Sequence, residues 1–186
     1  MKLELYLPTK PYQVTQKWGV KNPIYKKNGI NMDRHNGEDY LLGNGKLLCW
    51  PQRYRIIAVG YDPRGAGYYV MGQSVDRWEI EGSECYDQVI FMHLDQPVTW
   101  KLGDIAEIGD IVGIPDNTGF STGPHTHEGH YRVTEVGSRL DSNSANDSYD
   151  HSKYHVSFFA QDQKTVISLL SKLVEFYKQV LGLLRG

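Results

Sequence analysis

Cysteine, long hydrophobic runs and an excess of positive charge are all scarce in this sequence. Two cysteines, Cys49 and Cys85, occur among 186 residues, and a chain of this length builds its core without a disulfide, so two thiols are favoured over a disulfide bond. No stretch reaches the roughly 18 apolar residues that a membrane-spanning helix requires. The formal net charge of −2 argues against nucleic-acid binding through a basic surface.

The N-terminus lacks the pattern of a signal peptide, because no basic start is followed by an apolar run. The sequence therefore predicts either action inside a cell or export by another route. A length of 186 residues fits one domain with a short appendage better than two full domains.

Residues 1 to about 135 are predicted to form an antiparallel β structure. The chain contains 19 glycines, 13 tyrosines and 4 tryptophans, a composition typical of turns and strands. Residues 62–65, Asp-Pro-Arg-Gly, predict a hairpin turn. Strand-length apolar runs bounded by Gly, Pro, Asp or Asn occur at 47–50, 54–61, 67–75, 86–94 and 110–115.

The C-terminal residues 159–186 differ from the domain predicted at 1–158, because their apolar residues follow a helical spacing. This spacing predicts an amphipathic α-helix. Three interpretations of the helix stay open: docking on the sheet domain, self-association into a homo-oligomer through 163–184, and binding to a membrane surface. Its polar face is only mildly basic, which is weak for lipid binding. The heptad positions are Val166, Leu170, Leu173, Tyr177, Val180 and Leu184.

Histidines are concentrated in the stretch TGFSTGPHTHEGHYR, residues 118–132. Side chains at i and i+2 of a strand share one face, so His125 and His127 can contribute to one site. His130 is out of phase and is predicted to point elsewhere. The pair alone fits either a metal site or two hydrogen-bonded surface rings.

Two other stretches add polar residues of the same kind. In RHNGED (34–39), His35 and Asp39 can both turn inward if the chain bends at Gly37, although the stretch taken alone also fits a polar turn. A catalytic zinc ion takes three protein ligands and keeps one position for water, a set that His35, Asp39 and one histidine of the pair would provide. In FMHLD (91–95), His93 ends an apolar run and can face the same cleft.

The three motifs together, HNGED, FMHLD and GDIVGIPDNTGFSTGPHTH, resemble the lysostaphin-like zinc endopeptidases, which cut peptidoglycan peptides. The resemblance covers roughly residues 12–135. The lead-in to HNGED is similar to a version common in phage and related endolysin-type enzymes.

The resemblance implies a fold, a metal and a reaction. The fold is an antiparallel β-sandwich with a groove, called the duplicated hybrid motif. One Zn²⁺ per chain is implied, with His35, Asp39 and His127 as ligands. His125 would act as the general base, and His93 would orient the water or stabilise the oxyanion. The implied substrate is a cross-bridge or stem peptide of the cell wall.

Some residues depart from the family pattern. Glu128-Gly129-His130 stands where relatives have Phe-Glu and an aliphatic residue, which predicts an altered strand or a bulge. The segments 75–88 and 137–158 are expected to border the groove, with Trp78 and Tyr86 as candidate groove residues, although packing roles also fit both. The family's oxyanion tyrosine would correspond to Tyr25 or Tyr40.

Two alternatives remain beside the hydrolase. A non-catalytic wall-binding or partner-activating module could share the fold, and two histidines with one carboxylate also suit a non-haem iron oxygenase. Without a signal peptide, a wall hydrolase is expected to be phage-released, virion-associated or exported by a non-classical route.

Overall fold

The computed structural model describes residues 1–7, 12–23, 34–42, 47–140 and 148–156. Residues 1–155 form one compact unit. The helix predicted at 159–186 and the self-association through 163–184 lie outside the described residues, so both stay predictions. No helix of the described residues is long and apolar enough to cross a membrane.

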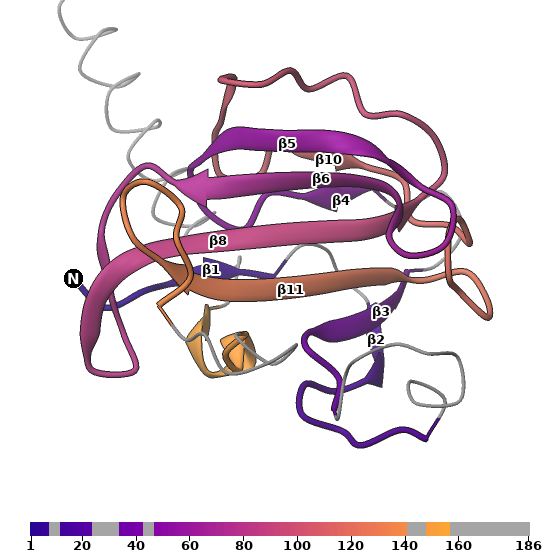
Figure 1. The fold of residues 1–186 in the computed structure, drawn as a ribbon, viewed down its shortest axis with the longest axis horizontal. Helices are drawn as coiled ribbons and strands as arrows, with labels where there is room; N and C mark the ends of the chain where they lie inside the picture. The colour runs from indigo at the N-terminus through magenta and orange to yellow at the C-terminus, as the bar shows by residue number, and fades with distance from the viewer. Residues whose placement is uncertain (8–11, 24–33, 43–46, 141–147, 157–186) are drawn as a thin grey trace, which may run out of the picture. The chain divides into compact units, whose positions relative to one another are not determined.

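A large antiparallel sheet of eight strands forms the centre of the fold. Its strands follow the order β2-β3-β11-β8-β6-β5-β9, and β7 pairs with β8. Figure 1 shows β5, β6, β8 and β11 side by side. The bounds are β2 (Tyr12–Gln16), β3 (Glu38–Leu42), β5 (Tyr54–Asp62), β6 (Gly67–Ser74), β7 (Trp78–Ile80), β8 (Ser83–Leu94), β9 (Ile105–Ala106) and β11 (Thr126–Val133).

The hairpin between β5 and β6 confirms the turn predicted at 62–65. The backbone N–H of Gly65 donates to the Asp62 carbonyl at 3.3 Å, and the N–H of Arg64 donates to the Asp62 side chain at 3.0 Å. Gly67 follows with a φ of 63°, a conformation that glycine adopts without strain. The mainly β, antiparallel architecture that the sequence predicted is therefore confirmed.

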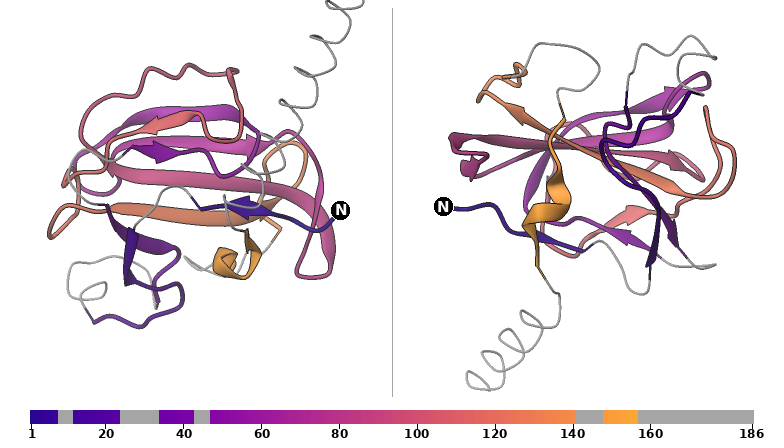
Figure 2. Two further views of the ribbon diagram at one scale, coloured as in Figure 1. Left: turned by 180° about the vertical axis from the view of Figure 1, so that it is seen from behind. Right: turned by 90° about the horizontal axis from the view of Figure 1, so that it is seen from below.

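Short elements cover one face of the large sheet, which we call the back face. Figure 2 (left) shows β1, β4 and β10 lying across it. The main hydrophobic core fills the space beneath β4 and β10, where the Trp50 ring lies 5.4 Å from both Tyr54 and Phe91. The short elements are β1 (Leu5–Tyr6), β4 (Leu48–Cys49), β10 (Ile111–Gly113), the 3-10 helix η1 (His151–Tyr154) and β12 (His155–Val156), which pairs with β1.

Successive side chains of β11 point alternately to the back face and to the opposite face of the sheet, which we call the front face. His127 pairs with Asp39 of β3 and Met92 of β8, and these side chains share the front face because directly opposed residues point the same way. Glu128 pairs with Phe91 and points to the back face. The register between β11 and β8 is unbroken from His127 to Val133, so the bulge predicted after the HTH motif was wrong.

A bulge occurs instead in β8, next to His93. Between the pairs Tyr68↔Leu94 and Val70↔Phe91, β8 advances one residue more than β6. His93 has a φ of 62°, in the left-handed region that non-glycine residues rarely adopt. Without the bulge, His93 would point away from its neighbour Met92, so the bulge is what turns its ring to the front face.

Both cysteines are free thiols, as the sequence favoured. Cys85 is buried in a second hydrophobic cluster, and Cys49 lies half-buried in β4. The fold is held by its core and ladders without a covalent cross-link among the described residues.

Candidate functional site

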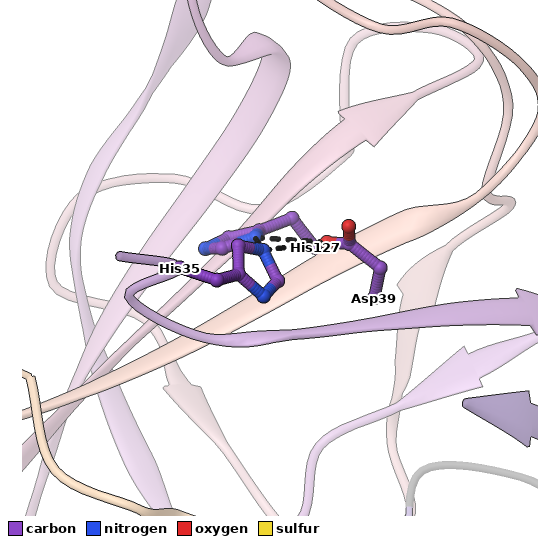
Figure 3. Close-up of side chains that lie close together, drawn as sticks. All are labelled: His35, Asp39 and His127. Carbon is purple, nitrogen blue, oxygen red and sulfur yellow. Dashed lines mark hydrogen bonds and ion pairs between the residues drawn. The ribbon is translucent and has the colours of Figure 1, made fainter. Parts of the chain in front are cut away.

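Three side chains from two segments of the chain meet on the front face. The Nε2 atom of His35 lies 3.0 Å from Nδ1 of His127 and 3.1 Å from Oδ1 of Asp39. Nδ1 of His127 lies 3.0 Å from the same carboxylate oxygen. Figure 3 shows the two rings and the carboxylate pointing toward one another. The structure therefore brings together the three residues that the motifs singled out as metal ligands.

The backbone before β3 fixes the ring of His35. The backbone N–H of His35 donates to the Val20 carbonyl at 2.8 Å, and the backbone carbonyl of His35 accepts from the N–H of Gly19 at 2.8 Å. The ring atom Nδ1 lies 3.1 Å from the Lys17 carbonyl, so Nδ1 carries the proton. Nε2 therefore keeps a lone pair that faces the cluster.

Gly37 makes room for the ring of His127. A Cβ atom at Gly37 would lie 2.6 Å from Nε2 of His127 and would also collide with the carbonyl oxygen of Glu128. Gly129 leaves space on the same side, since a Cβ there would approach His127 Nε2 to 3.2 Å. The bend at Gly37 that the sequence predicted thus has a steric reason, which is close approach of the β3 lead-in to β11.

The donor set fits a divalent metal ion. Two imidazole nitrogens and one carboxylate oxygen are typical ligands of catalytic zinc. A tetrahedral ion with bonds of about 2.0–2.1 Å holds its ligand atoms about 3.3 Å apart, close to the separations of 3.0–3.1 Å found here. Nδ1 of His127 and Nε2 of His35 would therefore bind together with Oδ1 of Asp39.

Asp39 is held in its charged form. Burial opposes ionisation, but the close contacts with His127 and His35 outweigh it and keep the pKa of Asp39 well below its usual range. An ionised carboxylate is the form that binds a cation.

His125 and His93 lie beside this cluster with their rings in contact, 4.8 Å between centroids. Nδ1 of His125 lies 2.7 Å from the Gly123 carbonyl, and Nδ1 of His93 lies 2.8 Å from the Thr118 carbonyl. Each carbonyl accepts a proton from Nδ1, which leaves Nε2 of each ring as an acceptor. Nε2 of His125 lies 3.8 Å from Oδ1 of Asp39, directly next to the donor set.

Burial affects His93 strongly. Loss of solvation lowers the pKa of its ring to about 4, although the hydrogen bond to the Thr118 carbonyl opposes this shift. His93 is therefore neutral near pH 7, with Nε2 unprotonated.

A cavity of about 400 Å³ opens over the five histidine and aspartate residues. Its other walls come from the β5–β6 turn, including Asp62 and Arg64, and from the loop that contains Phe120 and Ser121. Residues 62–65 predicted only a turn, and nothing in their sequence connects them with the site. The turn meets the histidines through contacts between distant segments, which are the pairing of β6 with β8 and the backbone hydrogen bond from His93 N–H to the Ala66 carbonyl.

Trp78 and Tyr86 do not line this cavity. Trp78 is buried in the second hydrophobic cluster with Leu5 and Ile80, and Tyr86 packs with Val133 and its neighbours on a different part of the sheet. The packing roles that the sequence left open describe both residues. The segment 75–88 does not form a loop at the groove, because most of it belongs to β7 and β8.

Tyr40 is excluded as an oxyanion donor. It follows Asp39 in β3 and therefore points to the back face, where it is fully buried and its hydroxyl donates to Glu38 at 2.7 Å. Tyr25 lies outside the described residues. Residues 148–156 likewise lie away from the groove, since Tyr149 and His151 contact His130 on the back face.

Comparisons with known proteins bear on this arrangement. No family model matches the chain. The chain is 33% identical over 93 residues to an uncharacterized metalloprotease of Haemophilus influenzae, a match covering 50% of this chain and 18% of that protein. It is 30% identical over 99 residues to lysostaphin of Staphylococcus simulans, covering 53% of this chain and 18% of lysostaphin. The match thus spans less than a fifth of either relative.

Solved structures show the same fold. The catalytic domain of the antimicrobial peptidase lysostaphin from Staphylococcus simulans has a TM-score of 0.57 at 23% identity, covering 77% of this chain and 91% of that domain. A zinc containing peptidase from Vibrio cholerae has a TM-score of 0.56 at 22% identity, covering 81% of this chain and 39% of that one.

The chain resembles the lysostaphin-like peptidases in sequence and shares their fold, as its three motifs predicted.

Proposed function

We propose that this chain is a zinc-dependent endopeptidase that hydrolyses peptide bonds in bacterial cell-wall peptidoglycan, in a cross-bridge or a stem peptide. The observation that carries the proposal is the convergence of His35, Asp39 and His127 within 3.0–3.1 Å beside an open cavity. The sequence similarity to lysostaphin and to a metalloprotease supports it. Action on the cell wall follows from this substrate, and phage origin stays a prediction from the motif context.

His35, Asp39 and His127 would hold the zinc ion of this site. When bound, zinc lowers the pKa of a coordinated water toward ~7 and polarises a carbonyl group. The zinc containing peptidase of similar fold supports zinc as the metal. The remaining steps depend on residues of the chain itself.

His125 is the proposed general base. Its ring is anchored through Nδ1 to the Gly123 carbonyl, and its free Nε2 lies 3.8 Å from Asp39 Oδ1. A water at the donor set would therefore lie within reach of that lone pair. The imidazole accepts the proton of the attacking water and then gives it to the leaving amine.

His93 is proposed to orient the water rather than stabilise an oxyanion. Because Nδ1–H donates to the Thr118 carbonyl at 2.8 Å, only the lone pair on Nε2 remains, and a lone pair cannot donate to an oxyanion. This role is supported by the position of His93, which lines the cavity and whose ring contacts that of His125.

The decisive experiment compares hydrolysis by the wild type with hydrolysis by His35→Ala. Purified cell walls of several peptidoglycan types are incubated with each protein, new amino groups are measured, and released fragments are sequenced by mass spectrometry. Chelation is expected to stop the wild type and added zinc to restore it. His35→Ala is expected to stay inactive with zinc added.

Arg53→Ala is the matched control, since the Arg53–Glu107 pair is largely exposed and lies outside the cavity. It is expected to retain full activity. Hydrolysis by His35→Ala at the wild-type rate would contradict the proposal. Binding to walls without release of amino groups would favour the wall-binding module, and iron rather than zinc in the purified protein would favour the oxygenase interpretation.

A further inference from the structure

A second cluster of ionisable side chains lies on the back face of β11, away from the cavity. It consists of Asp87 from β8, Glu128 and His130 from β11, and His151 from η1, and we call it the back-face cluster. All four residues are fully buried. Alternation along β11 puts Glu128 and His130 opposite the face that carries His127.

Two carboxylates bind the single ring of His130. Its Nδ1 lies 2.9 Å from Oδ2 of Asp87, and its Nε2 lies 2.9 Å from Oε1 of Glu128. Asp87 also accepts hydrogen bonds from the hydroxyls of Tyr54 and Tyr149. Both carboxylate oxygens of Asp87 are therefore hydrogen-bonded.

Glu128 and His151 are not satisfied in the same way. Among the described residues, Oε2 of Glu128 and Nδ1 of His151 are buried and have no hydrogen-bond partner. Nε2 of His151 lies 3.2 Å from the Tyr40 hydroxyl, and that hydroxyl gives its own proton to Glu38. Nε2 must then carry the proton of the His151 ring, so Nδ1 holds a lone pair.

Two buried hydrogen-bond acceptors, Oε2 of Glu128 and Nδ1 of His151, thus have no donor among the described residues. Each such atom costs about 1–3 kcal/mol when unpaired. Charge adds to this cost, because two buried carboxylates, Asp87 and Glu128, bind the ring of His130, and the buried Glu38 lies 3.9 Å from Nε2 of His151. A cation relieves both costs at once, whereas a neutral donor relieves only the first.

We propose that Glu128, His130 and His151 hold a second divalent metal ion, of the class that zinc represents. One donor atom from each residue lies within 4.8 Å of the other two, so binding would close these separations by up to ~1.5 Å. Two imidazoles and one carboxylate form a ligand set that zinc accepts. This proposal does not depend on the proposed function.

Asp87 would then act on the ion through His130. Ligand histidines commonly donate their second ring N–H to a carboxylate, which fixes ring orientation. Here Nδ1–H of His130 donates to Asp87 in that manner. The proton now shared between Nε2 and Glu128 would be released as the metal binds, so uptake of the ion releases one proton.

The ion would join η1 to β11 on the face opposite the front-face site. Tyr149, two residues before η1, already binds β11 through its N–H, which donates to the His130 carbonyl at 3.1 Å. A metal bond to His151 would add a second connection two residues later. The second ion is thus structural, and it would support the strand that carries His127.

Metal counting by elemental analysis of the purified full chain tests the proposal. The wild type is expected to contain two equivalents of divalent metal. A His35→Ala/Asp39→Ala variant is expected to retain one, and His151→Gln is also expected to retain one. Tyr149→Phe, which removes no ligand, is the control and is expected to retain two.

No metal in the His35→Ala/Asp39→Ala variant would overturn the proposal and would indicate that water fills the cluster. One metal in the wild type that this variant retains would support the back-face site and count against the front-face zinc of the proposed function. If His151→Gln does not fold, cobalt titration of the His35→Ala/Asp39→Ala variant decides the question. One equivalent with the visible spectrum of a tetrahedral nitrogen–oxygen site is expected, and an absence of cobalt binding overturns the site. Hydrolysis assays are not involved, so failure here and failure of the proposed function are distinguishable.

Discussion

His127 and His130 lie three residues apart on one strand, yet their environments act in opposite directions. Burial lowers the pKa of His127 even though Asp39 opposes the shift. Burial also disfavours the charge of His130, but Asp87 and Glu128 outweigh it and raise its pKa to about 9. The ratio of carboxylates to imidazoles explains the contrast. On the front face one carboxylate, Asp39, contacts two imidazole rings. On the back face two carboxylates contact the one ring of His130.

The comparison separates two uses of the same residue types. The front face keeps imidazole lone pairs directed at a cavity, which suits a cation and a substrate. The back face keeps a proton between buried carboxylates, which suits cohesion of the fold. In our proposal the back face exchanges that proton for a metal ion without exposing the site to solvent.

The largest expected effect comes from making one substitution on each face. Asp39→Asn is expected to reduce hydrolysis by about a thousandfold or more, because it removes a ligand charge. It should change the free energy of unfolding by only about 1 kcal/mol. Asp87→Asn is expected to cost about 3–5 kcal/mol, because it leaves a buried imidazolium with less charge opposite. Urea unfolding and wall-hydrolysis assays measure the two effects.

The comparison breaks down if the two variants exchange phenotypes. If Asp39→Asn unfolds, and Asp87→Asn stays folded but no longer hydrolyses walls, the catalytic site would lie on the back face and not on the front face. Both assays are run at 25 °C and at one pH, so that the fraction folded corrects each activity.

A smaller effect is expected from Gly37→Ala. The added Cβ would collide with the carbonyl of Glu128 and lie 2.6 Å from His127 Nε2, so the ligand ring must shift. Metal affinity at the front-face site is expected to fall about 10–100-fold, measured by competition with a chromogenic chelator. Gly113→Ala is the control, because a Cβ there meets Leu94 at an ordinary 3.6 Å. Equal affinities in the two variants would contradict the steric role of Gly37.

The smallest effect is expected from Tyr149→Phe. The substitution removes the hydroxyl that donates to Asp87 at 2.8 Å, but Asp87 keeps its bonds to His130 and Tyr54. The free energy of unfolding should fall by about 1–2 kcal/mol with hydrolysis per folded molecule unchanged. A loss of hydrolysis without a loss of stability would show that the two faces are coupled.

The front-face residues could be predicted because their spacing is local. His125 and His127 share a face by strand periodicity, and the Gly between His35 and Asp39 marks a bend. The resemblance supplied the choice of His127 over His125 as the ligand. The hairpin at 62–65 followed from turn chemistry alone.

The back-face cluster could not be predicted because no local pattern connects its members. Asp87 and His130 meet through the pairing of β8 with β11, and His151 arrives from a polar segment that the sequence placed at the groove. The signal that was present, Glu128 and His130 at i and i+2, was interpreted as a disturbed strand. The bulge at His93 was equally hidden, since it depends on the register between β6 and β8.

The left-handed backbone at His93 has a consequence for how the site is read by mutation. With a φ of 62°, alanine at this position keeps the conformational strain while losing the ring, whereas glycine loses the ring and the strain together. Valine or isoleucine would be more strained still, because β-branched residues disfavour a positive φ. The effect of a substitution at residue 93 therefore depends on the backbone conformation as well as on the loss of the imidazole. The difference in the free energy of unfolding between His93→Gly and His93→Ala would therefore measure the backbone strain that accompanies an imidazole at this position.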